Sequence, residues 1–289
     1  YFNPDVEIKL SDAKKLDTEF APSVSLASEL TTSVNSIMLN VRSYGLSEMP
    51  VYYENYKKED ENFGKIISKF EELEKETKNM PELNTYITEV KKSYGEYKIY
   101  IEQTKQMNDS LAKLRADLLG LANIYMENAN SFLGANLSST KLSSNINQVI
   151  ALGNGVRINY FRAQVQRDIS LLETALNDIN KITNLLDETR SLTKNEVDIR
   201  TIDTIKTSLN NYKNSLTEFL TTWKNRTEME KIRTAKTLEF VDAIEKINHL
   251  GIDNTVKIAK STNVSLTFST IIMVIGLTIA VVLGIALSV

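Results

Sequence analysis

The sequence predicts an all-α fold, in which an elongated body of two stacked four-helix bundles is followed by a transmembrane helix. Three observations predict this fold. Apolar residues recur at alternating spacings of three and four over long stretches, as they do in helices that pack nearly parallel in bundles. Only 10 glycines and 4 prolines occur among 289 residues, and no stretch alternates apolar and polar residues as a strand does. Residues 266–287 are almost continuously apolar.

Three turn signals divide the body into four helical passes. Residues 79–81 read Asn-Met-Pro, residues 134–139 read GANLSS and residues 191–195 read SLTKN. Proline, glycine and small polar residues of this kind end one helix and begin the next. We expect the passes at about 5–78, 81–134, 139–190 and 196–262. At about 1.5 Å per residue the second pass is too long for one compact bundle, which predicts two modules placed end to end.

Two weaker breaks predict where the modules meet. GLSEMP at 45–50 and Gly-Asn-Gly at 153–155 lie at similar distances from the two distal turns. Glycine and proline both disfavour a continuing helix, so we expect a waist there. The distal module is then about 50–114 with 165–225, and the membrane-proximal module is the rest of an extracytoplasmic ligand-binding domain at 5–262.

An internal repeat supports two similar modules. Sliding the chain so that Val41-Arg42 lies on Val156-Arg157 also lays Tyr97-Lys98 on Tyr212-Lys213. Apolar matches count for little, because any two amphipathic helices share a phase. The matching polar residues indicate an internal duplication of a helical hairpin.

The C-terminal segment is predicted to cross a membrane. No charged residue occurs from Ser261 to Val289. Roughly 20 apolar residues are enough for a helix to cross a bilayer core of about 30 Å. We therefore expect a transmembrane helix at 264–289 and a location in the cell membrane. The absence of cysteine is compatible with an extracytoplasmic body that has no disulfides.

The residues needed for catalysis or metal binding are missing from the sequence. His249 is the one histidine and cysteine is absent, which excludes zinc sites and Cys/His nucleophiles. Neither GxxxxGK nor GxGxxG occurs, and the net charge of −3 includes no basic tract for nucleic acid. We expect no enzyme activity, no cofactor, no metal and no nucleic-acid partner.

Arginines provide the candidate ligand site. Arg42 and Arg157 occupy matched positions of the repeat, and counting from the turns brings arginines of all four passes to about one height. Converging guanidinium groups need an anion such as a carboxylate, and tyrosine adds hydroxyl donors. The alternative for each arginine is an outward ion pair with a nearby acid, such as Glu48, Asp117 or Asp168. The predicted residues for binding a small carboxylate are Arg42, Tyr44, Arg115, Arg157, Tyr160, Arg162 and Arg226.

Two segments carry a family resemblance. VRSYGLSEMPVYYENY from Val41 and NGVRINYFRAQVQRD from Asn154, with the closing membrane helix, resemble the helical bimodular sensor domain of bacterial methyl-accepting chemotaxis receptors. The resemblance covers about residues 5–262. By position, Arg42, Arg157 and Arg162 match the ligand-contacting arginines of that family.

The resemblance implies a fold, a partner and a function. It implies two stacked four-helix bundles held between two membrane helices, in a homodimer that binds small organic acids. It also implies a cytoplasmic output domain that acts on signalling proteins, so that this chain is a fragment ending with the second transmembrane helix. A ligand that grips the helices would bias the height or tilt of the last one, which carries the signal into the membrane.

Three alternatives stay open. The same sensor region occurs with a histidine kinase as its output. A helical pore-forming toxin also has long helices, but its apolar hairpin typically lies inside the chain. A tail-anchored tethering protein is expected to present one heptad helix near the membrane, in place of four matched passes.

Overall fold

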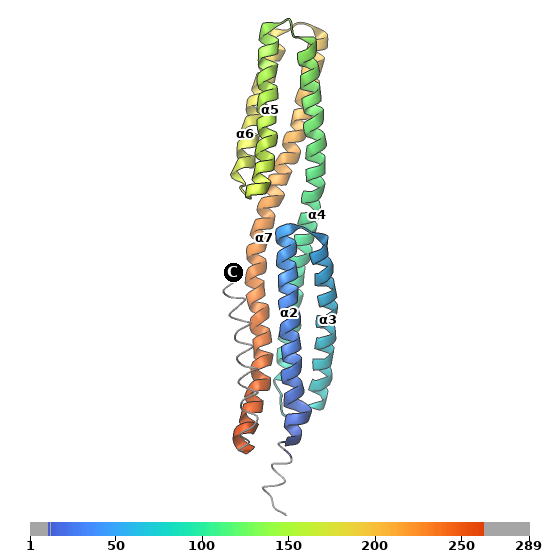
Figure 1. Ribbon diagram of the computed structural model, residues 1–289, viewed down its shortest axis with the longest axis vertical. Helices are drawn as coiled ribbons and strands as arrows, with labels where there is room; N and C mark the ends of the chain where they lie inside the picture. Colours follow the sequence, from blue (N-terminus) through green and yellow to red (C-terminus); the bar gives the residue numbers. More distant parts are fainter. Residues whose placement is uncertain (1–10, 12, 263–289) are drawn as a thin grey trace, which may run out of the picture. The chain divides into compact units, whose positions relative to one another are not determined.

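The computed structural model describes residue 11 and residues 13–262, which are almost entirely helical (Figure 1). No strand occurs among these residues, and the prediction of an all-α fold is confirmed. The helices are the short π-helical segment η1 (Leu16–Phe20), α2 (Ala21–Ser47), α3 (Pro50–Glu76), α4 (Leu83–Ala135), α5 (Thr140–Gln166), α6 (Ser170–Leu192) and α7 (Glu196–Thr262).

The predicted transmembrane helix at 264–289 lies outside the described residues. Within the described part of the chain, no helix combines the length and the apolar character that crossing a membrane requires.

The helices form two compact units. Unit 1 contains the described residues up to Glu102 and those from Lys231 onward, and unit 2 is Gln103–Glu230. Unit 1 therefore consists of η1, α2, α3, the first part of α4 and the last part of α7. Unit 2 consists of the rest of α4, α5, α6 and the first part of α7. Each unit contains four long helical segments, and α4 and α7 each contribute one segment to both units.

The helix ends agree with the three main turn signals, but two expected passes are helical hairpins. Residues 5–78 were expected as one pass, whereas α2 and α3 lie side by side in opposite directions (Figure 1). Lys69 of α3 pairs with Glu29 of α2 at 3.2 Å, and the Ser33 hydroxyl of α2 lies 3.4 Å from the Glu59 carboxylate of α3. The partners' numbers rise on one helix as they fall on the other, as an antiparallel pair requires.

The third pass, at 139–190, is likewise the hairpin of α5 and α6. One residue in the left-handed conformation ends the first helix of each hairpin: Glu48 with a φ of 59° after α2, and Arg167 with a φ of 55° after α5. The break expected at Gly153 and Gly155 does not occur, because a single glycine costs a helix only about 1 kcal/mol and packing can offset that.

The hairpins change how segments group into modules. The prediction placed residues 50–114 together with 165–225. In the structure, residues 50–102 belong to unit 1 and residues 165–225 belong to unit 2. The physical reason is side-chain packing: Phe63 of α3 contacts Tyr94 of α4 with ring centroids 4.1 Å apart, so α3 packs against the part of α4 that belongs to unit 1.

Each unit has its own apolar core. The core of unit 1 includes the buried residues Leu30, Ile37, Phe70, Leu83 and Phe240. The core of unit 2 includes Ile146, Val149, Leu172, Ile182 and Ile205. Complete burial of one such side chain contributes roughly 1.5–3 kcal/mol, so these two clusters supply most of the driving force for folding.

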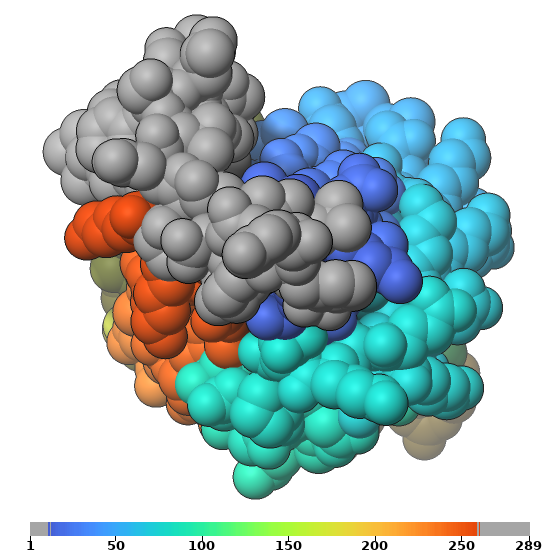
Figure 2. All heavy atoms as spheres, turned by 90° about the horizontal axis from the view of Figure 1, so that it is seen from below, coloured from blue at the N-terminus to red at the C-terminus, as the bar shows by residue number. Residues whose placement is uncertain are grey.

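α2 and α7 approach closely within unit 1. Figure 2 views this unit from its end, with α2 and α3 in blue, the start of α4 in cyan and the end of α7 in orange. A Cβ atom at Gly251 of α7 would lie 3.1 Å from the Val24 side chain of α2. The Asn248 amide donates to the Thr31 hydroxyl at 3.1 Å. A small residue and a hydrogen bond therefore set the spacing of these two helices.

Gly153 allows a buried tyrosine to cross α5 in unit 2. The Tyr125 hydroxyl of α4 donates to the Val149 carbonyl of α5 at 2.9 Å. A Cβ atom at Gly153 would lie only 2.6 Å from Cε1 of Tyr125, whereas one at Gly155 would meet nothing within 4 Å. Gly153 has helical backbone angles, so this packing depends on its small size and not on its conformational freedom.

Glu19 of η1 caps the loop between α3 and α4. Its carboxylate accepts the Thr77 hydroxyl, the Asn79 backbone N–H at 3.2 Å and the Asn79 side-chain amide at 2.8 Å. Burial acts to raise the pKa of Glu19, but the hydrogen bonds from Thr77 and Asn79 together outweigh it and leave the pKa lowered.

The two glycines of α5 provide a matched pair of substitutions. Gly153→Ala should lower the free energy of unfolding of unit 2 by about 1–3 kcal/mol, because Tyr125 must shift and its hydrogen bond is strained. Gly155→Ala should raise it by about 0.5–1 kcal/mol, because alanine is the better helix former. Urea denaturation of the full chain in a non-ionic detergent measures both. Equal effects of the two substitutions would contradict the close packing of Tyr125.

Glu19→Gln should destabilise unit 1 by about 1 kcal/mol at neutral pH, since a hydrogen bond to a charged group is replaced by weaker ones. A pKa lowered by folding contributes stability above the unfolded pKa and loses it as the pH falls through the folded pKa. The advantage of the wild type over Glu19→Gln should therefore disappear as the pH falls below about 4. Melting temperatures between pH 3 and 8 test this, with Glu61→Gln on the exposed side of α3 as the control.

Candidate functional site

The seven predicted site residues do not lie in one unit. Arg42 and Tyr44 belong to α2 in unit 1. The other five belong to unit 2: Arg115 on α4, Arg157, Tyr160 and Arg162 on α5, and Arg226 on α7. The prediction that the arginines lie at one height counted residues along passes 5–78 and 139–190 as single helices. Because each of these passes is a hairpin, that count does not apply.

Arg115 and Tyr160 share a groove between α4 and α5. We name it the Arg115 groove. Its volume is about 450 Å³, within the range of roughly 300–1,000 Å³ that holds small ligands. Residues three and four apart lie on one side of a helix, so each helix contributes one stripe of side chains. The lining residues are Arg115, Ala116, Leu119, Tyr160, Phe161, Gln164 and Val165.

The guanidinium group of Arg115 is held in place from two helices. Its Nε donates to Oε1 of Gln164 on α5 at 2.8 Å. The amide nitrogen of Gln164 donates to the Tyr160 carbonyl at 3.4 Å, which orients the acceptor. On α7, the ring of Phe219 lies 5.7 Å from Cζ of Arg115, a distance at which the cation is attracted to the ring face.

An aromatic row runs from the groove into the core of unit 2. The ring centroid of Tyr160 lies 5.3 Å from that of Phe161 and 5.4 Å from that of Phe219. Phe219 in turn contacts Trp223 at 5.8 Å. Burial raises the pKa of Tyr160, while the charge of Arg115 and a hydrogen bond with Gln164 act in the opposite direction. The phenol is therefore neutral at physiological pH and faces the groove as an aromatic wall.

The other arginines of unit 2 do not line this groove. Arg157 is half-buried, and its charge acts on buried Tyr212. Arg162 is exposed. The pKa of Asp168 is lowered by hydrogen bonds with Ser170 and, to a smaller extent, by the charge of Arg162. Asp168 is one of the acids named above as a possible outward partner of an arginine. Nη1 of Arg226 donates to the buried side chain of Asn108 at 3.3 Å. The structure thus brings Arg115 and Tyr160 together in one groove and gives the other three separate surroundings.

Tyr44 belongs to a tyrosine cluster in unit 1. Its ring lies 5.3 Å from that of Tyr53, which lies 5.5 Å from that of Tyr56. The Tyr53 hydroxyl donates to Glu102 at 2.8 Å, and burial is the first cause of its raised pKa. Arg42, two residues before Tyr44, is exposed.

Three further polar side chains meet beside this cluster, where Tyr94 interacts with Tyr56. The Tyr94 hydroxyl donates to one Asp60 oxygen at 2.6 Å, and Lys98 binds the other at 2.5 Å. Sequence reasoning noticed Tyr44 alone. The density of tyrosines around residues 52–56 and 94–100 was a signal that could have indicated the rest.

Arg233 is a buried arginine that sequence reasoning missed. It lies on α7 in unit 1 with 7% of its surface exposed. Burial raises the pKa of Tyr97, and the charge of Arg233 acts in the opposite direction. The sequence contains a signal for this burial. An interval of seven residues separates each of Phe219, Arg226, Arg233 and Phe240 from the next, so the two arginines occupy seam positions, which are those on the packed side of α7.

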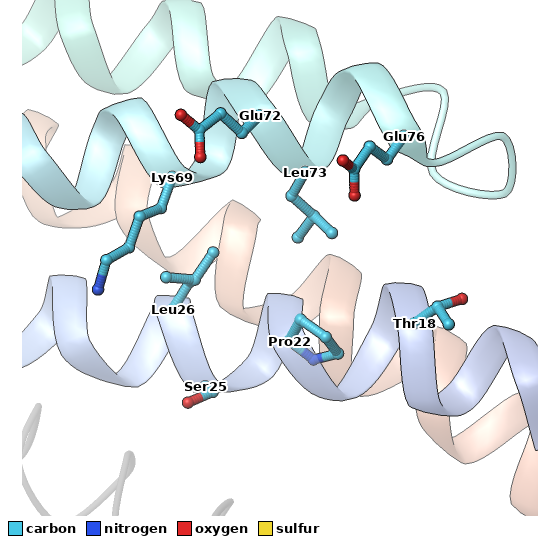
Figure 3. A pocket seen from close by; sticks show the side chains of 8 residues that line it. All are labelled: Thr18, Pro22, Ser25, Leu26, Lys69, Glu72, Leu73 and Glu76. Carbon is cyan, nitrogen blue, oxygen red and sulfur yellow. The ribbon is translucent and has the colours of Figure 1, made fainter.

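A second groove, of about 390 Å³, lies between α2 and α3 in unit 1 (Figure 3). Leu26 and Leu73 point toward one another from the two helices, and Glu72 and Glu76 stand at the rim. Lys69 of this groove is paired with Glu29. No group of side chains in the described residues is arranged to hold a metal ion.

No protein-family model matches the chain, and no curated protein matches it either.

A double-mutant cycle tests how Arg115 is held. Arg115→Lys keeps the charge but removes Nε, and Gln164→Leu removes the acceptor. Each should cost about 1 kcal/mol of unit 2 stability, with a coupling of about the same size because both remove one hydrogen bond. Urea denaturation followed by Trp223 fluorescence reports on unit 2, since it is the one tryptophan of the chain. Strictly additive effects would show that the bond contributes nothing.

Proposed function

We propose that the chain is the sensor region of a membrane chemoreceptor, with an extracytoplasmic body that binds a small carboxylate. The observation that carries the proposal is α7, a single helix of 67 residues that belongs to both units. As described, it runs to Thr262, within the charge-free segment of the sequence that begins at Ser261. A helix that takes part in both cores can pass a change in either unit along its own length.

The Arg115 groove supports the ligand-binding part of the proposal. Arg115 and Gln164 line it together with apolar side chains, and its volume suits a small molecule. Arg115 also contacts α7, because the ring of Phe219 lies 5.7 Å from its Cζ. A ligand shifts such a receptor only by its differential affinity for two arrangements, and a tenfold difference corresponds to about 1.4 kcal/mol.

Matched burial supports the proposed internal duplication. Val41 and Val156 are both buried, as are Ile67 and Ile182, the pair that the same shift superimposes. Tyr97 and Tyr212 are each 2% exposed. The hairpins α2–α3 and α5–α6 are the two copies under this proposal. A location in the cell membrane, a homodimeric state and output through cytoplasmic signalling proteins complete the proposal, and these rest on the resemblance and on the apolar segment.

A thermal-shift screen of the full chain in a non-ionic detergent tests carboxylate sensing. At a concentration of 100 times Kd, a bound acid stabilises the folded state by about 2.7 kcal/mol, which raises the melting temperature by several degrees. At least one small organic acid should produce this shift, and its neutral amide should not. A panel of mono-, di- and tricarboxylic acids that leaves the melting temperature unchanged would contradict the proposal.

A further inference from the structure

The helices of unit 2 differ in how they carry charge. Ion pairs join α6 to α7: Lys224 of α7 binds Glu173 of α6 at 2.7 Å, and Arg190 of α6 binds Asp203 of α7 at 2.9 Å. By contrast, α5 has three charged residues in 27 and no acid, whereas α6 has six charged residues in 23. Charged residues are depleted at the centres of protein interfaces, so the side of unit 2 on which α4 and α5 meet has the composition of a contact surface.

Exposed apolar side chains also gather on this side. Ile158 is 57% exposed, Phe161 50% and Val165 85%. Residues three and four apart lie on one side of a helix, so the exposed positions form one ridge on each helix. We name the two ridges together the α4–α5 face. The α4 ridge is Ala112, Ala116, Gly120 and Asn123. The α5 ridge is Asn154, Ile158, Phe161 and Val165.

The two ridges complement each other in size. Arg115 of α4 bonds Gln164 of α5 at 2.8 Å, and Tyr125 of α4 packs against Gly153 of α5. The numbers rise on α4 as they fall on α5, so each position on α4 has a fixed counterpart at its height on α5. The ridge residues at one height, to within about 3 Å, include Ala116 with Phe161, Gly120 with Ile158 and Asn123 with Asn154. Small residues of α4 thus match large residues of α5, and an asparagine matches an asparagine.

A two-fold axis parallel to the helices would use this match. Such an axis lays the α4 ridge of one copy on the α5 ridge of another at the same height, and it does so twice. The large side chains of α5 then enter the open space above the small residues of α4. A Cβ atom at Gly120 would meet nothing within 4 Å, so this space is present. The amides of Asn123 and Asn154 meet across the axis, and each has both donors and an acceptor for the other.

We infer that the α4–α5 face binds a second copy of this chain about such an axis. The inference rests on the proposed membrane anchor and homodimer, because two copies held in one membrane run in the same direction, and it adds the surface through which they meet. Arg115 takes no part, since Gln164 and Phe219 hold its guanidinium within its own unit. The second copy covers the exposed rim of the Arg115 groove at Phe161 and leaves its floor, which includes buried Tyr160, to a small ligand.

The size of the face predicts how strong the contact is. From Ala112 to Asn130, α4 is about 27 Å long, and two packed helices are about 20 Å wide, so the face has a projected area of about 500 Å². A ridged surface has a larger accessible area than its projection. Specific interfaces bury at least roughly 600 Å² per partner, so the face is near the lower limit for a specific dimer. We therefore expect a weak dimer whose population depends on concentration.

Sedimentation velocity of the full chain in a non-ionic detergent, over a range of concentrations and with no acid added, tests the inference. The wild type should dimerise reversibly. Asn123→Glu should raise the dissociation constant at least about tenfold, because the axis brings two unpaired carboxylates into the contact. Asn184→Glu adds the same charge at an exposed asparagine of α6 and should leave the dissociation constant unchanged.

A compensating substitution tests the two-fold arrangement. Asn154→Lys combined with Asn123→Glu should restore most of the lost affinity, because the two substituted side chains carry opposite charges and meet across the axis. All the substituted positions are exposed, so the helix content should stay the same, which far-ultraviolet circular dichroism checks.

The other outcomes overturn the inference in distinguishable ways. A chain that stays monomeric at every concentration would reject the inference and the homodimeric part of the proposed function, and would leave the face to a different protein. Carboxylate sensing is then still decided by the thermal-shift screen, which needs no dimer. Equal effects of Asn123→Glu and Asn184→Glu would place the contact elsewhere on the chain. A double variant that dissociates as readily as Asn123→Glu alone would reject the two-fold arrangement.

Discussion

The structure depends on two helices that serve two cores. α4 and α7, of 53 and 67 residues, each have one stretch buried in unit 1 and another buried in unit 2. A helix presents a continuous apolar stripe to a core only where apolar residues recur at spacings of three and four. Each hairpin therefore needs its own complementary stretch of that stripe, and the positions of α2–α3 and α5–α6 along the chain follow from this requirement.

The stripe becomes polar in the middle of both helices. On α4 the buried residues Thr104 and Asn108 follow Ile101, and on α7 Arg226 and Arg233 occupy seam positions. These stretches are where each helix passes from one unit to the other along the chain. Buried polar groups contribute less to stability than apolar ones unless they are hydrogen-bonded. The two apolar cores therefore do not merge into one stripe along either helix.

The candidate site depends on how α5 is placed in unit 2. Gly153 lets Tyr125 pack across α5, and Phe161 and Gln164 line the groove about two and three turns further along the same helix. Gln164 then orients Arg115, whose guanidinium lies over a ring of α7. A small residue in the core and a hydrogen bond at the surface thus act on the same geometry. The chemistry of the groove, one cation among apolar side chains, follows from which stripes of α4 and α5 face one another.

The sequence by itself determined the helical class, the main turns and the residue types of the site, because apolar spacing, proline positions and arginine content are local properties. Only the tertiary structure decided that Glu48 and Arg167 reverse the chain, which turns two expected passes into hairpins. It also decided that Arg115 and Tyr160 share a groove while Arg42 lies in the other unit. Spacing along a chain gives the face of a helix. Which faces meet depends on packing between residues far apart in sequence, such as Gly153 with Tyr125, and no local pattern contains that information.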